Sequence, residues 1–202
     1  KPALYSAGEH RLAKDLEQAH IIMGFRGVSR LDDDFFAVKA LSTILGGGMS
    51  SRLFQEVREK RGLVYAIYSF HSAYRDDGQF GIYAGTGPED LPELVPVMCD
   101  EILKATHTIQ NDELARAKAQ LKSGMLMGRE SMMTRADQQA KHLIFKHEAL
   151  NVQDIIDGVD ALSIEDIQRV ATRIFHSPPT LAALGPLGAL EPYSAIQDRI
   201  AA

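Results

Sequence analysis

The stretch GGGMSSRLFQEVREKRGLVYAIYSF, residues 46–70, decides how the chain folds. Its three glycines follow a helical pattern of apolar residues, so they predict a helix stop and a hinge. Ser50 or Ser51 is then the expected N-cap of a second helix, which ends at Gly62. Residues 63–74 are rich in β-branched and aromatic side chains and predict a strand.

Upstream of the glycines, the sequence predicts a strand followed by a helix. Residues 19–28, AHIIMGFRGV, alternate in the manner of a half-buried strand. Residues 29–48 show apolar side chains at helical spacing, with Ser29 or Asp32 as the expected N-cap and three acidic residues in the first turn.

Downstream, a hairpin and a long helical region are expected. DDG at 76–78 is a strong hairpin signal. The pattern is helical from Thr86 to about residue 176, beginning with Thr86 and Glu89 at capping-box spacing and with Asn151 and Ser163 as the expected N-caps of later helices. Residues 179–187 predict a last short strand. This order differs from the alternation of a doubly wound sheet and predicts an α+β fold, a largely antiparallel sheet covered by helices on one face.

Composition limits the possible functions. The chain has 202 residues with a net charge of -5, which argues against a nucleic-acid binder. We expect residues 1–202 to form a single domain, with no membrane span because no 18-residue apolar run is present. One cysteine, Cys99, excludes an intrachain disulfide and favours a reducing compartment. Because the first residue is Lys1 rather than Met, we expect a piece of a longer polypeptide.

Three common kinds of catalytic site do not match the sequence. A phosphate-binding loop needs its glycines between a strand and a helix with a lysine after them, and the glycines at 46–48 lack both features. A serine hydrolase needs G-x-S-x-G, which GMSSR at 48–52 does not provide. Cys99 lies on an apolar helix face, where a thiol is usually buried and unreactive.

The seven histidines give no zinc motif, because both H-E-x-x-H and its inverse H-x-x-E-H are absent. His142 and His147 are five residues apart, about 140° around a helix, so they cannot bind one ion together. His20 and His71 lie in or near predicted strands and could approach each other, but no third ligand is evident. We therefore expect no metal to be bound by this chain.

Arg58 and Tyr65 remain as candidate site residues. Arg58 lies near the end of the helix after the glycines, and Tyr65 lies at the start of the first hairpin strand. The turn at Gly62 separates them, and such a corner can direct a guanidinium and a phenol into one space. From the residues alone, the commoner alternative is a surface ion pair of Arg58 with Glu56 or Glu59, beside a half-buried tyrosine.

The sequence resembles the C-terminal half of an M16 peptidase, the family of mitochondrial processing peptidase, pitrilysin and insulin-degrading enzyme. Its compact bacterial and processing-peptidase-like branch is the most similar. The resemblance covers about residues 8–187. It is carried by LGGGMSSRLFQEVREKRGLVYAIYSF (45–70), DLEQAHIIMGFRG (15–27) and ELARAKAQLKSGMLMGRES (113–131).

The resemblance implies the LuxS/MPP-like metallohydrolase fold, with two homologous halves paired like a clam shell around a peptide chamber. The zinc motif of the family belongs to the N-terminal half, so Zn²⁺ would be bound in the full enzyme and not by this chain. In active members the C-terminal half contributes an arginine and a tyrosine seven residues apart. Arg58 and Tyr65 match this pair, so the resemblance favours a catalytic role over a surface ion pair.

The implied function is the substrate-binding C-terminal half of a zinc-dependent endopeptidase, inactive by itself. Its partners would be an N-terminal zinc-binding half or partner subunit and a peptide substrate. The alternative is a non-catalytic M16-like subunit, either a respiratory-complex core protein or a regulatory processing-peptidase subunit. The regulatory type has a much longer glycine-rich loop than residues 46–48.

The expected location is the bacterial cytoplasm, with the mitochondrial matrix as the alternative. An isolated half would expose the face meant for its partner, so a homodimer would not be surprising.

Overall fold

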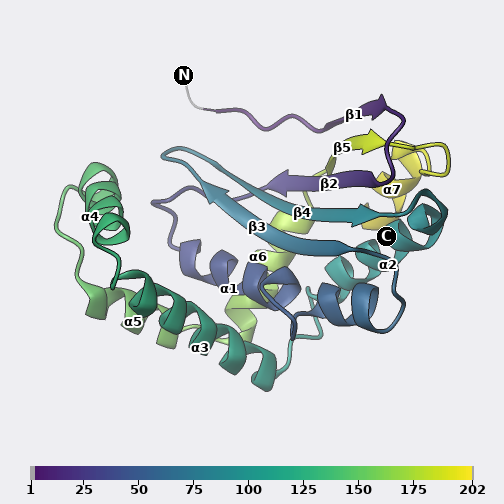
Figure 1. Ribbon diagram of the computed structural model, residues 1–202. Coiled ribbons are helices and arrows are strands. Elements are labelled where there is room, and N and C mark those ends of the chain that lie inside the picture. Colours follow the sequence, from purple (N-terminus) through teal and green to yellow (C-terminus); the bar gives the residue numbers. More distant parts are fainter. Residues whose placement is uncertain (1–2, 202) are drawn as a thin grey trace.

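An open sheet with helices on one of its faces makes up the structure, a computed structural model that describes residues 3–201 (Figure 1). The strands are β1 (Gly8–Ala13), β2 (Ala19–Arg26), β3 (Ala66–Ala73), β4 (Gly78–Thr86) and β5 (Thr180–Gly185). The helices are α1 (Phe35–Gly46), α2 (Leu91–Lys104), α3 (Asn111–Gly128), α4 (Met132–Lys146), α5 (Val152–Asp160), α6 (Ile164–Phe175) and α7 (Tyr193–Ala201). A π-helix, η1 (Phe54–Glu59), and a short 3-10 helix, η2 (Pro88–Asp90), complete the described elements. The predicted α+β fold is confirmed.

The strands follow the spatial order β1-β5-β2-β4-β3. β2 is antiparallel to β4 and β5, and β3 forms the predicted hairpin with β4. β1 pairs with β5 in parallel, the exception in a largely antiparallel sheet. Neither β1 nor α7 was predicted. The sequence of β1, GEHRLA, lacks regular apolar alternation because an edge strand of this sheet needs little burial.

One face of the sheet packs against α1 and α6 to form the core. β2 contributes Ile21, Met23 and Phe25, which are fully buried, as the alternation of residues 19–28 predicts. The Phe175 ring of α6 meets Phe25 edge-to-face, with ring centroids 5.0 Å apart. Fully burying a side chain of this size contributes about 1.5–3 kcal/mol, so this face anchors the sheet. None of the helices in residues 3–201 is long and apolar enough to cross a membrane.

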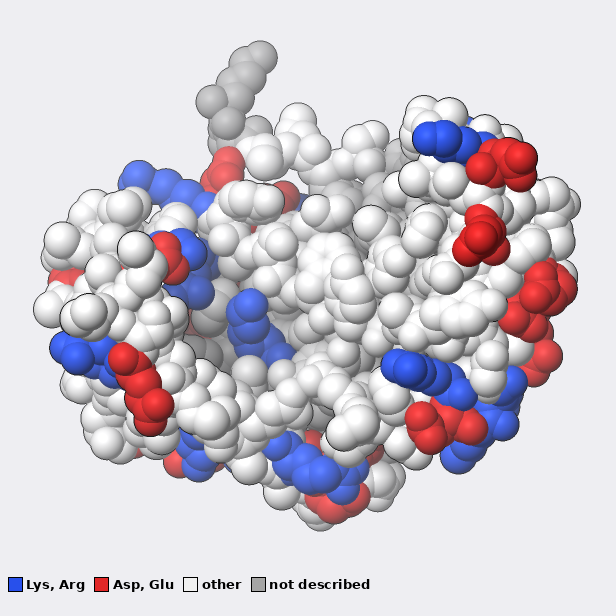
Figure 2. Space-filling model, viewed as in Figure 1, with Lys and Arg blue, Asp and Glu red and all other residues white. Residues whose placement is uncertain are grey.

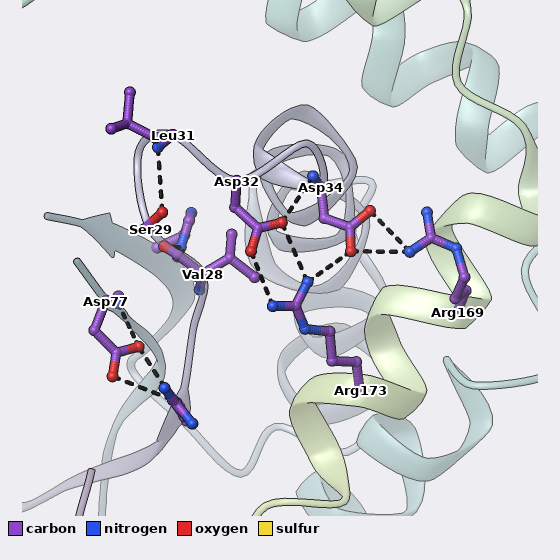
Figure 3. A network of polar contacts seen from close by, with 11 residues as sticks. Val28, Ser29, Leu31, Asp32, Asp34, Asp77, Arg169 and Arg173 are labelled. Carbon is purple, nitrogen blue, oxygen red and sulfur yellow. Dashed lines mark hydrogen bonds and ion pairs between the residues drawn. The ribbon is translucent and has the colours of Figure 1, made fainter. Parts of the chain in front are cut away.

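The helix that follows β2 begins later than expected and without an acidic cap. α1 starts at Phe35, and no side chain caps it. Asp32 accepts the backbone N–H of Asp34, and both carboxylates turn toward α6 (Figure 3). Arg173 Nη2 lies 2.9 Å from Asp32 Oδ2, and Arg173 Nη1 lies 2.7 Å from Asp34 Oδ2. The acidic residues therefore join two helices rather than begin one.

The first of the three glycines has a packing role. Gly46 is the last residue of α1, and Gly47 after it caps the helix with an ordinary negative φ of -83°. A Cβ at Gly46 would lie 2.3 Å from the backbone nitrogen of Ser69 in β3. The helix therefore approaches the strand backbone more closely than any side chain permits, and a glycine is required there.

Two other expected caps are absent and two are confirmed. The Ser51 hydroxyl donates to the Gly48 carbonyl instead of capping the next helix. The Thr86 hydroxyl donates to the Leu63 carbonyl, so no capping box begins α2. Ser163 and Asn151 cap α6 and α5 as predicted. The wrong cap predictions share a cause, because these hydroxyls find nearer carbonyls in the folded chain.

Gly46→Ala should destabilise the fold. Inserting a methyl group against a backbone atom costs about 1–3 kcal/mol, more than the gain of about 1 kcal/mol from the better helix propensity of alanine. Gly48→Ala is the control, because its Cβ would meet only Gln120 Nε2, at 3.6 Å. Urea unfolding should show a lower midpoint for the first variant alone. Equal midpoints would contradict the close packing of α1 on β3.

Arg173→Ala should lower the free energy of unfolding at neutral pH by about 1–2 kcal/mol, the value of charge-assisted hydrogen bonds reduced for partial exposure. The hydrogen bond from Arg173 lowers the pKa of Asp32 below its ordinary value in the folded protein. A carboxyl group whose pKa is lowered by folding stabilises the fold at every pH above its ordinary pKa. This stabilisation is lost as the pH falls through the pKa of the folded state.

The destabilisation by Arg173→Ala should therefore shrink in strong acid. Arg116→Ala removes only an exposed pair with Asp112 and serves as the control, with a change under about 0.5 kcal/mol. A loss that is independent of pH would show that the pair with Asp32 contributes little.

Candidate functional site

The candidate site is a corner where η1 leads into the sheet. Lys60 donates its backbone N–H to Gln55, five residues back, as in a π-helix, a form that is frequent at functional sites. Gly62 follows with a φ of +68°. Leu63 then donates its backbone N–H to the Val57 carbonyl, and both of these side chains are buried. The corner is thereby fixed to the core on both sides of its turn.

The start of the π-helical segment is also anchored. Arg52 Nε lies 2.7 Å from Glu113 Oε1 of α3, and both side chains are largely buried. A second nitrogen of the same guanidinium donates to the Thr108 carbonyl at 2.7 Å. Buried ion pairs with this many hydrogen bonds hold a defined geometry. The segment that carries Arg58 is therefore held at its beginning as well as at its turn.

Arg58 is exposed in this segment, and its guanidinium carbon lies 4.9 Å from the centre of the Phe54 ring. Within residues 3–201 it forms no ion pair, because Glu56 pairs with Lys60 and, at 3.0 Å, with Arg61. The alternative of a surface ion pair for Arg58 is therefore wrong in this structure. Stacking on a ring orients a guanidinium and leaves its N–H donors free.

Tyr65 lies one residue before β3, because the strand begins at Ala66, slightly later than predicted. Its backbone N–H donates to the Gly85 carbonyl at 2.9 Å, and its side chain is 60% exposed. Ala66 faces the same Gly85 in the strand pairing. Tyr65 and Ala66, two consecutive residues, thus meet the single residue Gly85 on β4. This is the pattern of a β-bulge, which redirects a side chain at the end of a strand. No hydrogen bond joins Tyr65 to Arg58 in the described chain, so both side chains are available to a ligand.

Aromatic side chains lie next to this corner, on the face of the sheet that the helices leave open. The rings of Tyr68 on β3 and Tyr83 on β4 stack with centroids 4.9 Å apart. His20 Nδ1 of β2 lies 2.8 Å from the Tyr83 hydroxyl. Sequence reasoning missed this group, because the hairpin turns over residues 74–77, earlier than the DDG signal at 76–78 indicates, and only this register places Tyr68 opposite Tyr83.

The histidines do not assemble a metal site in the described part of the chain, which holds no group of three or more potential ligands. His20 lies on the open face, whereas His71 is buried on the opposite face and bonds through Nε2 to Val28. Burial lowers the pKa of His71 to about 4, so the ring is neutral at pH 7. The two histidines therefore do not approach each other.

Cys99 is buried in α2, as expected for an unreactive thiol. Burial raises its pKa to about 12, which keeps the sulfur protonated at neutral pH.

Acidic and basic side chains are interspersed around the rim of the face in Figure 2, and neither sign forms a stripe.

Comparisons with known proteins agree on one family. A family model described as the peptidase M16 inactive domain matches residues 1–121. A protein of Streptomyces coelicolor, named as an uncharacterized zinc protease, is 38% identical over 87% of this chain and 39% of its own length. A protein of the same name from Rickettsia felis is also 38% identical, over 92% of this chain and 45% of its own length. The chain thus spans less than half of these curated relatives.

Solved structures show the same fold. A peptidase M16 inactive domain from Pseudomonas fluorescens matches 95% of this chain and 46% of its own, with a TM-score of 0.82 and 26% identity. A chain of complex III from Candida albicans matches 98% of this chain and 50% of its own, with a TM-score of 0.90 and 18% identity. At that identity the second match establishes the fold alone.

Gly62→Ala should disturb the corner between Arg58 and Tyr65. A side chain in the left-handed region costs about 1–2 kcal/mol, and Gly62→Asn should cost less, because asparagine adopts this region more readily. Gly124→Ala in α3 is the matched control, since its Cβ also meets nothing within 4 Å but its φ is not positive. That control should be neutral or stabilising by up to about 1 kcal/mol. Chemical denaturation measures both, and equal effects would mean that the turn is not strained.

Proposed function

The chain belongs to the M16 peptidase family, and we propose that it is the substrate-binding half of a zinc-dependent endopeptidase. Residues 1–202 would form one domain of the longer protein, inactive by itself. The description of the matching family model as an inactive domain supports this division, as do the names of the curated relatives. The two curated relatives quoted above are bacterial, which supports a bacterial protein, and we propose the cytoplasm as its location.

Arg58 and Tyr65 carry this proposal. An exposed guanidinium is oriented on the Phe54 ring while the neighbouring carboxylate of Glu56 binds other cations. An exposed phenol follows seven residues later on a separately anchored backbone. Within residues 3–201 the Arg58 guanidinium has no ion pair and the Tyr65 hydroxyl has no hydrogen bond, so both groups are free to bind a ligand. Both are hydrogen-bond donors suited to peptide carbonyl oxygens.

The chemistry follows from these residue types. Negative charge develops on the carbonyl oxygen of the scissile bond when water attacks it. The Tyr65 hydroxyl would donate a hydrogen bond to that oxygen, where a preformed donor contributes most. The Arg58 guanidinium would donate to a neighbouring carbonyl of the peptide and hold it in register. Neither group needs to gain or lose a proton in this role.

Zinc would be bound outside this chain. The described residues offer no set of three ligands, so they do not fit a catalytic zinc ion. The matched region covers less than half of the relatives named as zinc proteases, which leaves room for a zinc-binding half in those proteins. We propose that such a half, on the same chain or in a partner subunit, is the partner of this domain.

Cleavage of a quenched fluorogenic peptide library by the full-length protein tests the proposal. Activity should disappear with a zinc chelator and return when zinc is added. Absence of cleavage at every zinc concentration would contradict the peptidase function and favour a non-catalytic subunit.

Tyr65→Phe in the full-length protein should lower kcat by about 10²–10³-fold, because it removes one donor to the transition state. Arg58→Ala should lower kcat and raise KM, because the guanidinium would bind the peptide before and during reaction. Tyr74→Phe and Arg75→Ala are controls, since both residues are exposed beyond the far end of β3. Steady-state kinetics measures all four variants. If Tyr65→Phe retains kcat/KM within about twofold, less than 0.5 kcal/mol, the assigned role is wrong.

A further inference from the structure

We propose that the aromatic side chains on the open face of the sheet form a subsite for a large apolar side chain of the bound peptide. We call this group, made of His20, Tyr68, Phe70 and Tyr83, the aromatic ladder. The inference rests on the proposed function and adds to it a preference for one class of substrate residue.

The ladder is a continuous surface across three strands. Tyr68 stacks on Tyr83 and lies 6.3 Å from Phe70 between ring centroids. A Cβ at Gly81 would lie 2.3 Å from the Phe70 ring, so the missing side chain gives that ring its place on the sheet. Tyr68 is 47% exposed, although it is packed against two other rings. An apolar partner would cover this exposed ring surface.

The geometry of the ladder is held by a hydrogen bond. The Tyr83 hydroxyl and His20 Nδ1 are 2.8 Å apart, and the two rings stack with centroids 6.1 Å apart. Burial, together with the nearby Tyr68, raises the pKa of Tyr83, so its phenol is protonated at neutral pH. A fixed and uncharged ring loses little entropy when a side chain packs on it.

The surroundings favour an apolar side chain over a charged one. The positions of β3 and β4 that face the open side are Ala66, Tyr68, Phe70 and Ser72 on one strand and Gln79, Gly81, Tyr83 and Gly85 on the other. None of these residues is charged, and the surface over the two strands is uncharged in Figure 2. A basic or acidic side chain would find no counter-charge on these strands. Aromatic and aliphatic side chains would gain from burial and stacking.

The position of the ladder connects it to the proposed catalytic corner. Gly85, which accepts the backbone N–H of Tyr65, pairs with His20 on the next strand. Tyr68 is three residues from Tyr65, about 10 Å along an extended strand. A peptide held at Tyr65 would therefore place a side chain within three residues of the scissile bond over the ladder.

Peptide binding to the zinc-free full-length protein tests the subsite without cleavage. The probes are two fluorescein-labelled decapeptides of alanine, glycine and serine, one with a single phenylalanine and the other with alanine at that position. Fluorescence anisotropy should show that the phenylalanine peptide binds about 3- to 10-fold more tightly, as expected for aromatic packing. Tyr68→Ala should remove this preference. Tyr74→Ala, which removes another exposed tyrosine beyond the end of β3, should keep it.

The proposed subsite would be refuted by equal binding of the two peptides to the wild-type protein, or by a preference for the phenylalanine peptide that survives Tyr68→Ala. Tyr83→Phe keeps the ring and removes the hydrogen bond to His20 that holds it, so the preference should be reduced but not lost. Because zinc is absent, the result does not depend on peptidase activity. A failure of cleavage with intact binding preference would contradict only the proposed function.

Discussion

The contact between the end of α1 and the backbone of β3 constrains the rest of the structure. At Gly46 the helix lies so close to Ser69 that no side chain fits between them. The Ser69 hydroxyl donates to the Ser42 carbonyl on the same helix, which fixes the strand along its length. With β3 held in this way, the position at which the strand begins is also fixed. Tyr65 and the turn at Gly62 are therefore placed by packing in the core rather than by the loop itself.

The two faces of the sheet have separate tasks. The face that packs on α1 and α6 contributes the buried apolar residues of β2 and β4 and stabilises the domain. The opposite face carries the stacked rings of Tyr68 and Tyr83 beside the proposed catalytic corner. Strand alternation makes this division possible, because successive residues point to opposite faces. A single hairpin can thus anchor the fold with one set of side chains and present a binding surface with the other.

The sequence was sufficient for the elements whose periodicity agrees with their packing. The β3–β4 hairpin, α1 and the helices between residues 86 and 176 were all predicted, and the fold class followed from their order. β1 was missed because an edge strand that is mostly exposed needs no apolar alternation. The expected caps at Asp32 and Thr86 were wrong because each side chain bonds to a group that is distant in sequence, whereas Ser51 bonds to the carbonyl of Gly48 in the turn just before it.

The candidate site was predictable only in part. The spacing of Arg58 and Tyr65 is visible in the sequence, and their roles came from a family resemblance. The pairing of Glu56 with Lys60 has the i, i+4 spacing that is visible in the sequence, whereas its contact with Arg61, five residues on, accords with the π-helical geometry of η1. The aromatic ladder depends on the pairing of β2 with β4, a contact between distant parts of the chain.

A structure of the full-length protein with an uncleavable peptide bound at its zinc ion would test the account most directly. We predict that the Tyr65 phenol oxygen lies within about 3 Å of the carbonyl oxygen at the scissile position, a normal hydrogen-bond distance. The Arg58 guanidinium should contact a neighbouring carbonyl of the same peptide. A peptide bound at zinc while both side chains remain in solvent would contradict the assignment of this domain as the substrate-binding half.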